Sequence, residues 1–134
     1  MFYKFKKITS LDLSNFNTSS VTNIKHLFIG YIKLTSLNLS NFKTPNLKKM
    51  GGMFHGCTSL AYLDISNLET SNVDDFGSLF FNCENLEYIN LTNFNTQKSD
   101  EIRWMFSGCK KNKSLDISKF NLSTAKMIEI ISQK

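Results

Sequence analysis

A short stretch of alternating apolar and polar residues recurs along the whole chain. Residues 11–16 read Leu-Asp-Leu-Ser-Asn-Phe, and close variants start at residues 37, 63, 89 and 115, always 26 positions further on. Two apolar side chains separated by one polar residue predict a short strand with one buried and one exposed face. A fixed period of this length is typical of solenoids, in which successive strands pair in parallel.

Each repeat also contains a second apolar pattern with a different spacing. In the first copy it consists of Val21, Ile24, Leu27 and Phe28; it returns at residues 47–54 and 73–80, and in the fourth copy Ser99 takes the first apolar place. This spacing predicts a helix of about two turns with one buried face. A threonine before each segment suits an N-cap, and a glycine or asparagine after it suits a C-cap.

Together the two patterns predict an α/β fold with a single solenoid domain over residues 1–134, built from about five strand–turn–short-helix units of 26 residues. Residues 1–10 are a truncated repeat, residues 11–36, 37–62, 63–88 and 89–114 are full repeats, and residues 115–134 are a last strand and a C-terminal capping helix. Packed helices stand further apart than paired strands, so the parallel sheet is expected on the concave face.

The first residues match the later part of a repeat. Met1 and Phe2 lie one repeat before Leu27 and Phe28. Met105 and Phe106 hold the same repeat position three repeats later. The ends of solenoids normally carry a polar cap, because an open end exposes the core. We therefore expect the chain to be a fragment of a longer protein, and an open end would allow end-to-end self-association.

Three longer motifs connect these repeats with a known family. Leu-x-x-Leu-Asp-Leu-Ser-Asn-Phe, Met-Phe-x-Gly-Cys and Thr-Ser-Asn-Val together cover roughly residues 1–122. They resemble the BspA-like leucine-rich repeats, in the variant abundant in Mycoplasma and some Gram-positive surface proteins. The resemblance implies a right-handed solenoid and a parent protein at the cell surface or secreted. It also implies binding to host, matrix or neighbouring-cell proteins, although the repeat here is slightly longer than usual.

Charge and hydropathy exclude two classes of partner. The net charge of +5 comes from scattered lysines, and no basic stripe with interleaved aromatic residues predicts nucleic-acid binding. No apolar run approaches the roughly 20 residues of a membrane span, and the first residues lack the apolar core of a signal peptide. The sequence therefore predicts neither nucleic-acid binding nor membrane insertion by this chain.

The cysteines and histidines do not form a catalytic or metal-binding pattern. Cys57, Cys83 and Cys109 share one repeat position, which Tyr31 holds in the first copy, so the position is expected to be apolar and buried. A column of inert thiols is the main interpretation, and a disulfide between neighbouring repeats would leave one thiol free. His55 lies two residues before Cys57, but nothing implies a third group to orient it. We expect no enzyme activity, no metal and no cofactor.

The outward-facing side of the strands is the best candidate for a binding surface. Its middle column is Asp12, Asn38, Asp64, Asn90 and Asp116. Tyr62 and Tyr88 lie beside this column in adjacent repeats. One interpretation is a solvated polar face stabilised by side-chain ladders; the other is a ligand surface centred on the two tyrosines, because exposed tyrosines often anchor interfaces.

These observations predict a non-enzymatic protein-interaction module that acts in adhesion or surface recognition through the strand face. The alternative is a structural spacer whose repeats confer length and bind no specific ligand. The expected partner of the interaction module is a protein on a host cell, in the matrix or on a neighbouring cell.

Overall fold

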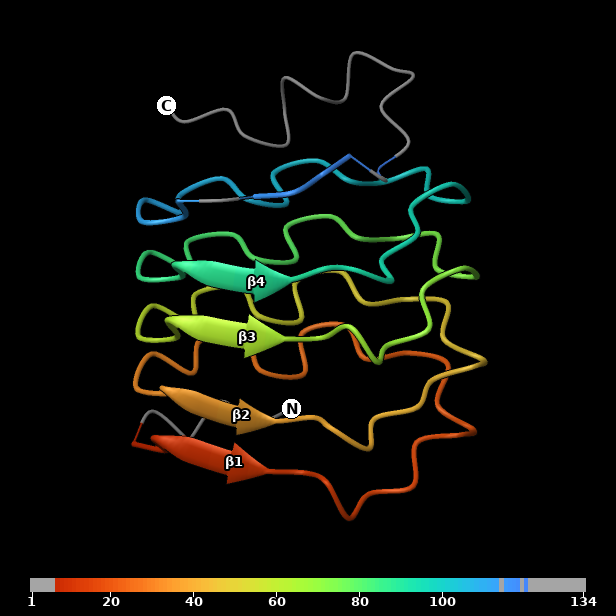
Figure 1. Ribbon diagram of the computed structural model, residues 1–134, viewed down its shortest axis with the longest axis horizontal. Helices are drawn as coiled ribbons and strands as arrows, with labels where there is room; N and C mark the ends of the chain where they lie inside the picture. Colours follow the sequence, from red (N-terminus) through yellow and green to blue (C-terminus); the bar gives the residue numbers. More distant parts are fainter. Residues whose placement is uncertain (1–6, 114, 119, 121–134) are drawn as a thin grey trace.

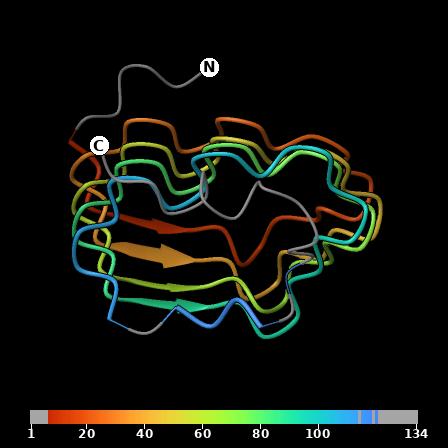
Figure 2. The same cartoon turned by 90° about the horizontal axis from the view of Figure 1, so that it is seen from above.

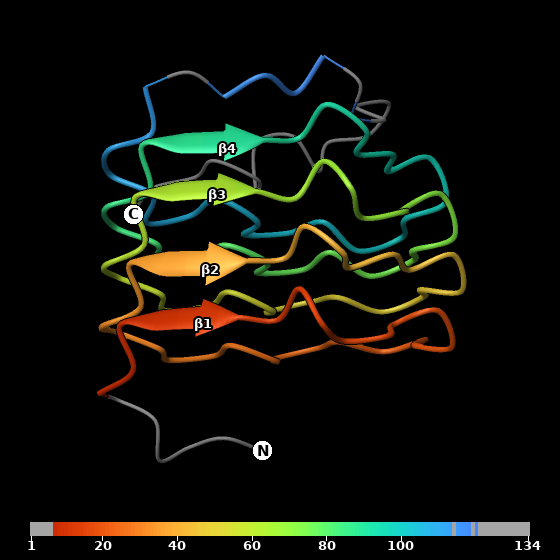
Figure 3. The same ribbon diagram turned by 60° about the horizontal axis from the view of Figure 1, so that its bottom comes forward.

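The chain is arranged as a stack of similar turns, one above another, in the computed structural model (Figures 1 and 3). The structure describes residues 7–113, 115–118 and 120. Its strands are β1 (Ser10–Asp12), β2 (Ser36–Asn38), β3 (Tyr62–Asp64) and β4 (Tyr88–Asn90). We call each 26-residue unit a rung, and rungs 1 to 4 contain β1 to β4.

The strands pair in parallel at the spacing of the sequence period. β1 pairs with β2 and β3 with β4, and each residue lies opposite the one 26 positions later, as with Leu11 and Leu37. This register brings side chains of the same repeat position together across neighbouring strands. Parallel pairing in the predicted register is therefore present, while the handedness and the leucine-rich-repeat class stay predictions.

The sheet is interrupted between β2 and β3. β1–β2 and β3–β4 are separate two-stranded sheets, and no backbone hydrogen bond joins β2 to β3, all of whose residues are described. Side chains bridge this seam instead: the Asn67 amide donates to the Leu39 carbonyl at 2.5 Å. At the two outer steps the equivalent amides of Asn41 and Asn93 reach the carbonyls of Ser14 and Ser66.

The predicted helices are absent from the described residues, so this part of the prediction is wrong. We call the segments in their place the return segments; they are residues 24–30, 50–56, 76–82 and 102–108. The Phe28 N–H donates to the Met53 carbonyl of the next rung at 2.9 Å, whereas a helix would bond it four residues back. His26 and Gly30 also have φ of 57° and 71°, and a left-handed residue every fourth position breaks a helix.

The return segments connect the rungs on the side opposite the strands (Figure 2). Parallel bridges link Asn23 to Lys49, Lys49 to Asp75 and Asp75 to Glu101. Backbone hydrogen bonds thus set the rung spacing on this side as well. The expected concave strand face depended on a wider layer of helices, and that premise does not hold.

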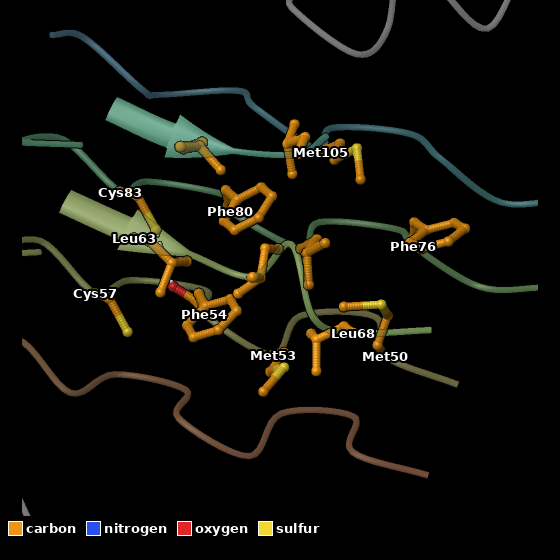
Figure 4. Packing of buried hydrophobic residues seen from close by; sticks show 14 of the residues in the cluster. Met50, Met53, Phe54, Cys57, Leu63, Leu68, Phe76, Phe80, Cys83 and Met105 are labelled. Atoms are coloured by element: carbon orange, nitrogen blue, oxygen red, sulfur yellow. Dashed lines mark hydrogen bonds between the residues drawn. The ribbon is translucent and has the colours of Figure 1, made fainter. Parts of the chain in front are cut away.

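The core consists of columns of equivalent side chains between the two layers (Figure 4). The rings of Phe28, Phe54, Phe80 and Phe106 stack with successive centroid distances of 5.6, 5.6 and 5.2 Å. Such ladders remove apolar surface from water and fix the vertical register of the rungs.

The threonines predicted as N-caps join rungs instead. Thr18, Thr44, Thr70 and Thr96 are buried. The Thr18 hydroxyl donates to the Lys43 carbonyl at 2.7 Å, and Thr70 Oγ1 accepts from the Asn95 N–H at 2.7 Å. These bonds satisfy backbone groups inside the stack. The predicted capping helix and most of the truncated first repeat lie outside the described residues.

Candidate interaction surface

Two exposed tyrosines stack on each other at the start of β3 and β4. Tyr62 and Tyr88 are directly paired in the sheet register, with ring centroids 5.0 Å apart and planes 9° from parallel. Their side chains are 58% and 43% exposed. The sheet register places the rings face to face, so they form a flat aromatic surface that is already ordered before any ligand binds.

Asp64 and Asn90 lie two residues further along the same strands. The Asn90 amide donates to Asp64 Oδ2 at 3.1 Å. Partial burial raises the pKa of Asp64, but hydrogen bonds from Ser66 and Asn90 outweigh it and hold the pKa below its usual value. The carboxylate therefore stays ionised at neutral pH and is held in one orientation beside the tyrosines.

Every member of the predicted Asp/Asn column also accepts a hydrogen bond from the backbone two residues on. The acceptors are Asp12, Asn38, Asp64, Asn90 and Asp116, at 2.9–3.1 Å. The backbone bond from Ser14 lowers the pKa of Asp12. These short polar side chains stabilise the turn after each strand, which is a structural reason for the column to recur.

The structure groups only part of the predicted site. Tyr62, Tyr88, Asp64 and Asn90 form one patch on the β3–β4 sheet, whereas Asp12 and Asn38 lie on the β1–β2 sheet beyond the seam. Asp116 lies next to the patch, because it lines a cavity of about 550 Å³ together with Tyr88, Asn90, Leu115 and Phe120. Sequence periodicity did not predict this cavity.

The cysteine column is buried, as predicted, and its three thiols are free in this structure. The thiols of Cys57, Cys83 and Cys109 donate to backbone carbonyls of the rung below at 3.0–3.2 Å. Burial raises the pKa of Cys57 to about 12 and that of Cys109 to about 11, and it raises that of Cys83 well above the usual value. Thiols in this state are poor nucleophiles, because the thiolate is the reactive form.

His55 and the neighbouring Cys57 thiol have separate partners. Its ring lies against Phe81 with centroids 4.9 Å apart, and burial, followed by the charge of His26, lowers its pKa. The Cys57 thiol is instead bonded to the Phe28 carbonyl. Among the described residues, no three His, Cys, Asp or Glu side chains are grouped as a metal site would require.

A comparison with protein families shows to which family the chain belongs. A family model described as "Mycoplasma protein of unknown function, DUF285" matches residues 1–120. The chain belongs to this family. The match spans all four rungs and includes both stacked tyrosines. The DUF285 chain matches no curated protein and no solved structure. No helix in the described part of it is long and apolar enough to cross a membrane.

One exposed residue of this DUF285 chain was missed by the sequence reasoning. Trp104 is 50% exposed, has φ of 56°, and packs beside the Arg103 guanidinium, 5.8 Å from the ring centroid. It occupies the place of His26, Gly52 and Ser78 in the earlier rungs. The available signal was the chain's single tryptophan at a position that holds small or polar residues elsewhere.

An ion pair that spans two rungs was also missed. Lys25 Nζ lies 2.6 Å from Asp75 Oδ2, and Gly51 stands between them in the intervening rung. A side chain on Gly51 would approach Asp75 Oδ1 to 2.6 Å, so the absence of a Cβ leaves room for the pair. The signal in the DUF285 sequence was the column of Lys25, in which the next two members are Gly51 and Gly77, beside the column that contains Asp75.

Proposed function

We propose that this chain is a non-enzymatic protein-interaction module of the BspA-like leucine-rich-repeat type, forming a right-handed solenoid. Its parent protein acts at the cell surface or in secreted form, in adhesion or surface recognition. The partner is a protein on a host cell, in the matrix or on a neighbouring cell. The observation that carries the proposal is the stacked, exposed pair Tyr62–Tyr88 beside the ionised Asp64.

Physical chemistry supports this choice of surface. Tyrosine offers a large apolar ring with a polar tip, and burying it costs little side-chain entropy. The two rings already hold each other in place, so a partner does not have to order them. Asp64 and Asn90 supply acceptors and donors at the edge of the rings, where interfaces usually place polar groups.

A structural spacer is the second candidate. The Asp/Asn column stabilises its own turns, and each tyrosine ring has a partner ring. Both features would be present if the strand face contacted only water. The two candidates differ in a single respect, which is whether the tyrosine pair contributes to binding.

The test is binding of the purified chain to immobilised fibronectin, laminin and collagen and to intact epithelial cells. We expect the Tyr62→Ala/Tyr88→Ala variant to bind at least about tenfold more weakly, since interface anchors contribute about 2 kcal/mol or more. The matched control is Ser10→Ala/Ser36→Ala, which changes the same column on β1 and β2 and should bind like the original chain. Equal binding by all three proteins would show that the tyrosine pair is not the binding surface, and no binding by any of them would favour the spacer.

A further inference from the structure

Asp64 has no basic partner among the described residues. Ion pairs join other acidic side chains of this region to lysine or arginine; these are Asp74, Asp75, Glu84, Glu87 and Glu101. No such pair reaches Asp64, although the chain carries a net charge of +5. The strand face at β3 therefore presents a negative charge that the chain's own cations leave unpaired.

The Asp64 carboxylate is oriented and retains capacity for a further donor. Its Oδ1 accepts the Ser66 N–H at 2.9 Å, and its Oδ2 accepts the Asn90 amide at 3.1 Å. An ionised carboxylate has about four acceptor sites, so each oxygen can accept another bond. A donor that approaches the strand face meets an anion whose position is already set, which lowers the entropic cost of binding it.

The tyrosine pair leaves a ring face open beside this carboxylate. Tyr62 and Tyr88 cover each other's inner faces, because their planes are 9° from parallel. The outer face of Tyr62 is turned towards β2, where the same column holds the small, exposed Ser36. No backbone hydrogen bond draws β2 and β3 together at this step. The face of an aromatic ring is its negative side, and at Tyr62 it is accessible from the strand face.

A negative ring face and a carboxylate side by side favour a cation, and arginine fits both. Tyr62 and Asp64 are two residues apart in β3, so both side chains lie on the exposed face with their Cα atoms about 7 Å apart. A guanidinium is planar, stacks on aromatic rings and can donate two parallel bonds to a carboxylate. A lysine ammonium is a compact, strongly hydrated charge that cannot do both as well.

The chain contains an example of this arrangement in its return segments. The Arg103 Nε donates to both carboxylate oxygens of Glu101, at 3.0 and 2.9 Å. The same guanidinium lies 5.8 Å from the centroid of the Trp104 ring. One arginine thus contacts a carboxylate and an aromatic ring that are close together in the sequence.

We propose that the patch of Tyr62, Tyr88, Asp64 and Asn90 recognises an arginine side chain of the partner protein, with the guanidinium over the outer face of Tyr62 and hydrogen-bonded to Asp64. The inference rests on the proposed function and specifies the chemistry of its partner. The net charge of the chain by itself attracts acidic segments. A preference for a basic segment would therefore come from this patch and not from the overall charge.

The test is an NMR titration of the full chain with the end-capped peptide Gly-Arg-Gly-Arg-Gly, because amide shifts detect even weak binding. Two comparison peptides carry citrulline, the neutral isostere of arginine, or glutamate at both arginine positions. Asp64→Asn removes the charge and keeps the fold, since Asn38 and Asn90 accept the same turn bond in the same column. The matched control Asp12→Asn removes the same charge on β1, where Ser10 stands in place of a tyrosine. Circular dichroism melts establish that the variants are folded.

We expect the arginine peptide to shift the amides of Tyr62, Asp64 and Tyr88 in a saturable way, and the citrulline and glutamate peptides to shift them little. Asp64→Asn should weaken binding of the arginine peptide about threefold or more, the effect of losing an exposed ion pair. Tyr62→Ala should weaken it by a similar factor, because the cation loses the ring face. Asp12→Asn should bind like the original chain.

Three results would overturn the proposal: no saturable shift with the arginine peptide up to its solubility limit, equal affinity for the arginine and citrulline peptides, or equal affinity of Asp64→Asn and Asp12→Asn for the arginine peptide. The proposed function is tested separately by binding to matrix proteins and cells. Matrix binding that depends on the tyrosines, without binding of the arginine peptide, would leave that function in place and remove only the arginine. Arginine binding without matrix or cell binding would keep the cation site and remove the proposed partners.

Discussion

Single residues in this molecule are best understood by comparison with their column. Ile8, Leu34, Leu60 and Leu86 share one repeat position, and three of them are completely buried leucines. Asn112 is the next member of the column, and its Oδ1 and Nδ2 are buried without a hydrogen-bond partner in the described part of the chain. A buried amide without partners destabilises the folded state, because it has lost its bonds to water.

We therefore expect Asn112→Leu to raise the free energy of unfolding by about 1–3 kcal/mol. Urea denaturation followed by circular dichroism measures the change. Asn85→Leu is the matched control: its amide donates to the Thr58 carbonyl at 2.6 Å, so the same substitution should lower stability. A fall in stability with Asn112→Leu would show that the amide is paired in solution.

At the scale of elements, the sequence predicted the strands and failed on the return segments. Strand positions follow from alternation, and their register follows from the period. The apolar spacing of Val21, Ile24, Leu27 and Phe28 fits a helix, but it also fits a segment whose direction is reset every four residues, as at His26 and Gly30. The sequence favours a C-cap at Gly30 and gives no sign of the left-handed backbone at His26.

Gly52 shows what this backbone requires. Its φ is 62°, and an added Cβ would lie 2.4 Å from His26 Nδ1. We expect Gly52→Ala to lower the free energy of unfolding by more than the roughly 1–2 kcal/mol that a left-handed alanine alone costs, because the His26 ring must also move. In the double variant Gly52→Ala/His26→Ala, the loss of stability caused by the clash with the ring should disappear, while the loss caused by the left-handed backbone should remain. Urea denaturation of the two single variants and the double variant measures this coupling; additive effects would show that the ring does not obstruct the site.

At the scale of the whole molecule, the rungs are held more continuously on the return side than on the strand side. The Leu13 N–H donates to Asn38, and the Ile65 N–H donates to Asn90, but the equivalent Leu39 N–H forms no backbone bond across the seam. The Asp/Asn column continues across the seam without a break in its period, although the neighbouring column changes there from Ser10 and Ser36 to Tyr62 and Tyr88. Periodicity therefore predicted the columns of the candidate site but could not show that the seam divides it.

Hydrogen exchange tests the seam directly. We expect the backbone amides of Leu39 and Ala61 to exchange faster than those of Leu13, Ile65 and Glu87, which are bonded to the neighbouring rung. Exchange followed by NMR resolves these amides individually. Equal protection at all five positions would mean that β1 to β4 form one continuous sheet in solution.

In the return segments, the N–H groups of each rung donate to carbonyls of the next rung, and this common direction has an electrical consequence. In each rung the carbonyl of one residue and the N–H of the next belong to the same peptide group, so four peptide dipoles per rung point along the stack axis. Dipoles aligned in this way add together, as they do in an α-helix. The edge at Ile102–Gly108 therefore has a positive potential and the edge at Asn23–Ile29 a negative one. Each added rung lengthens the dipole, so its moment increases with the number of repeats.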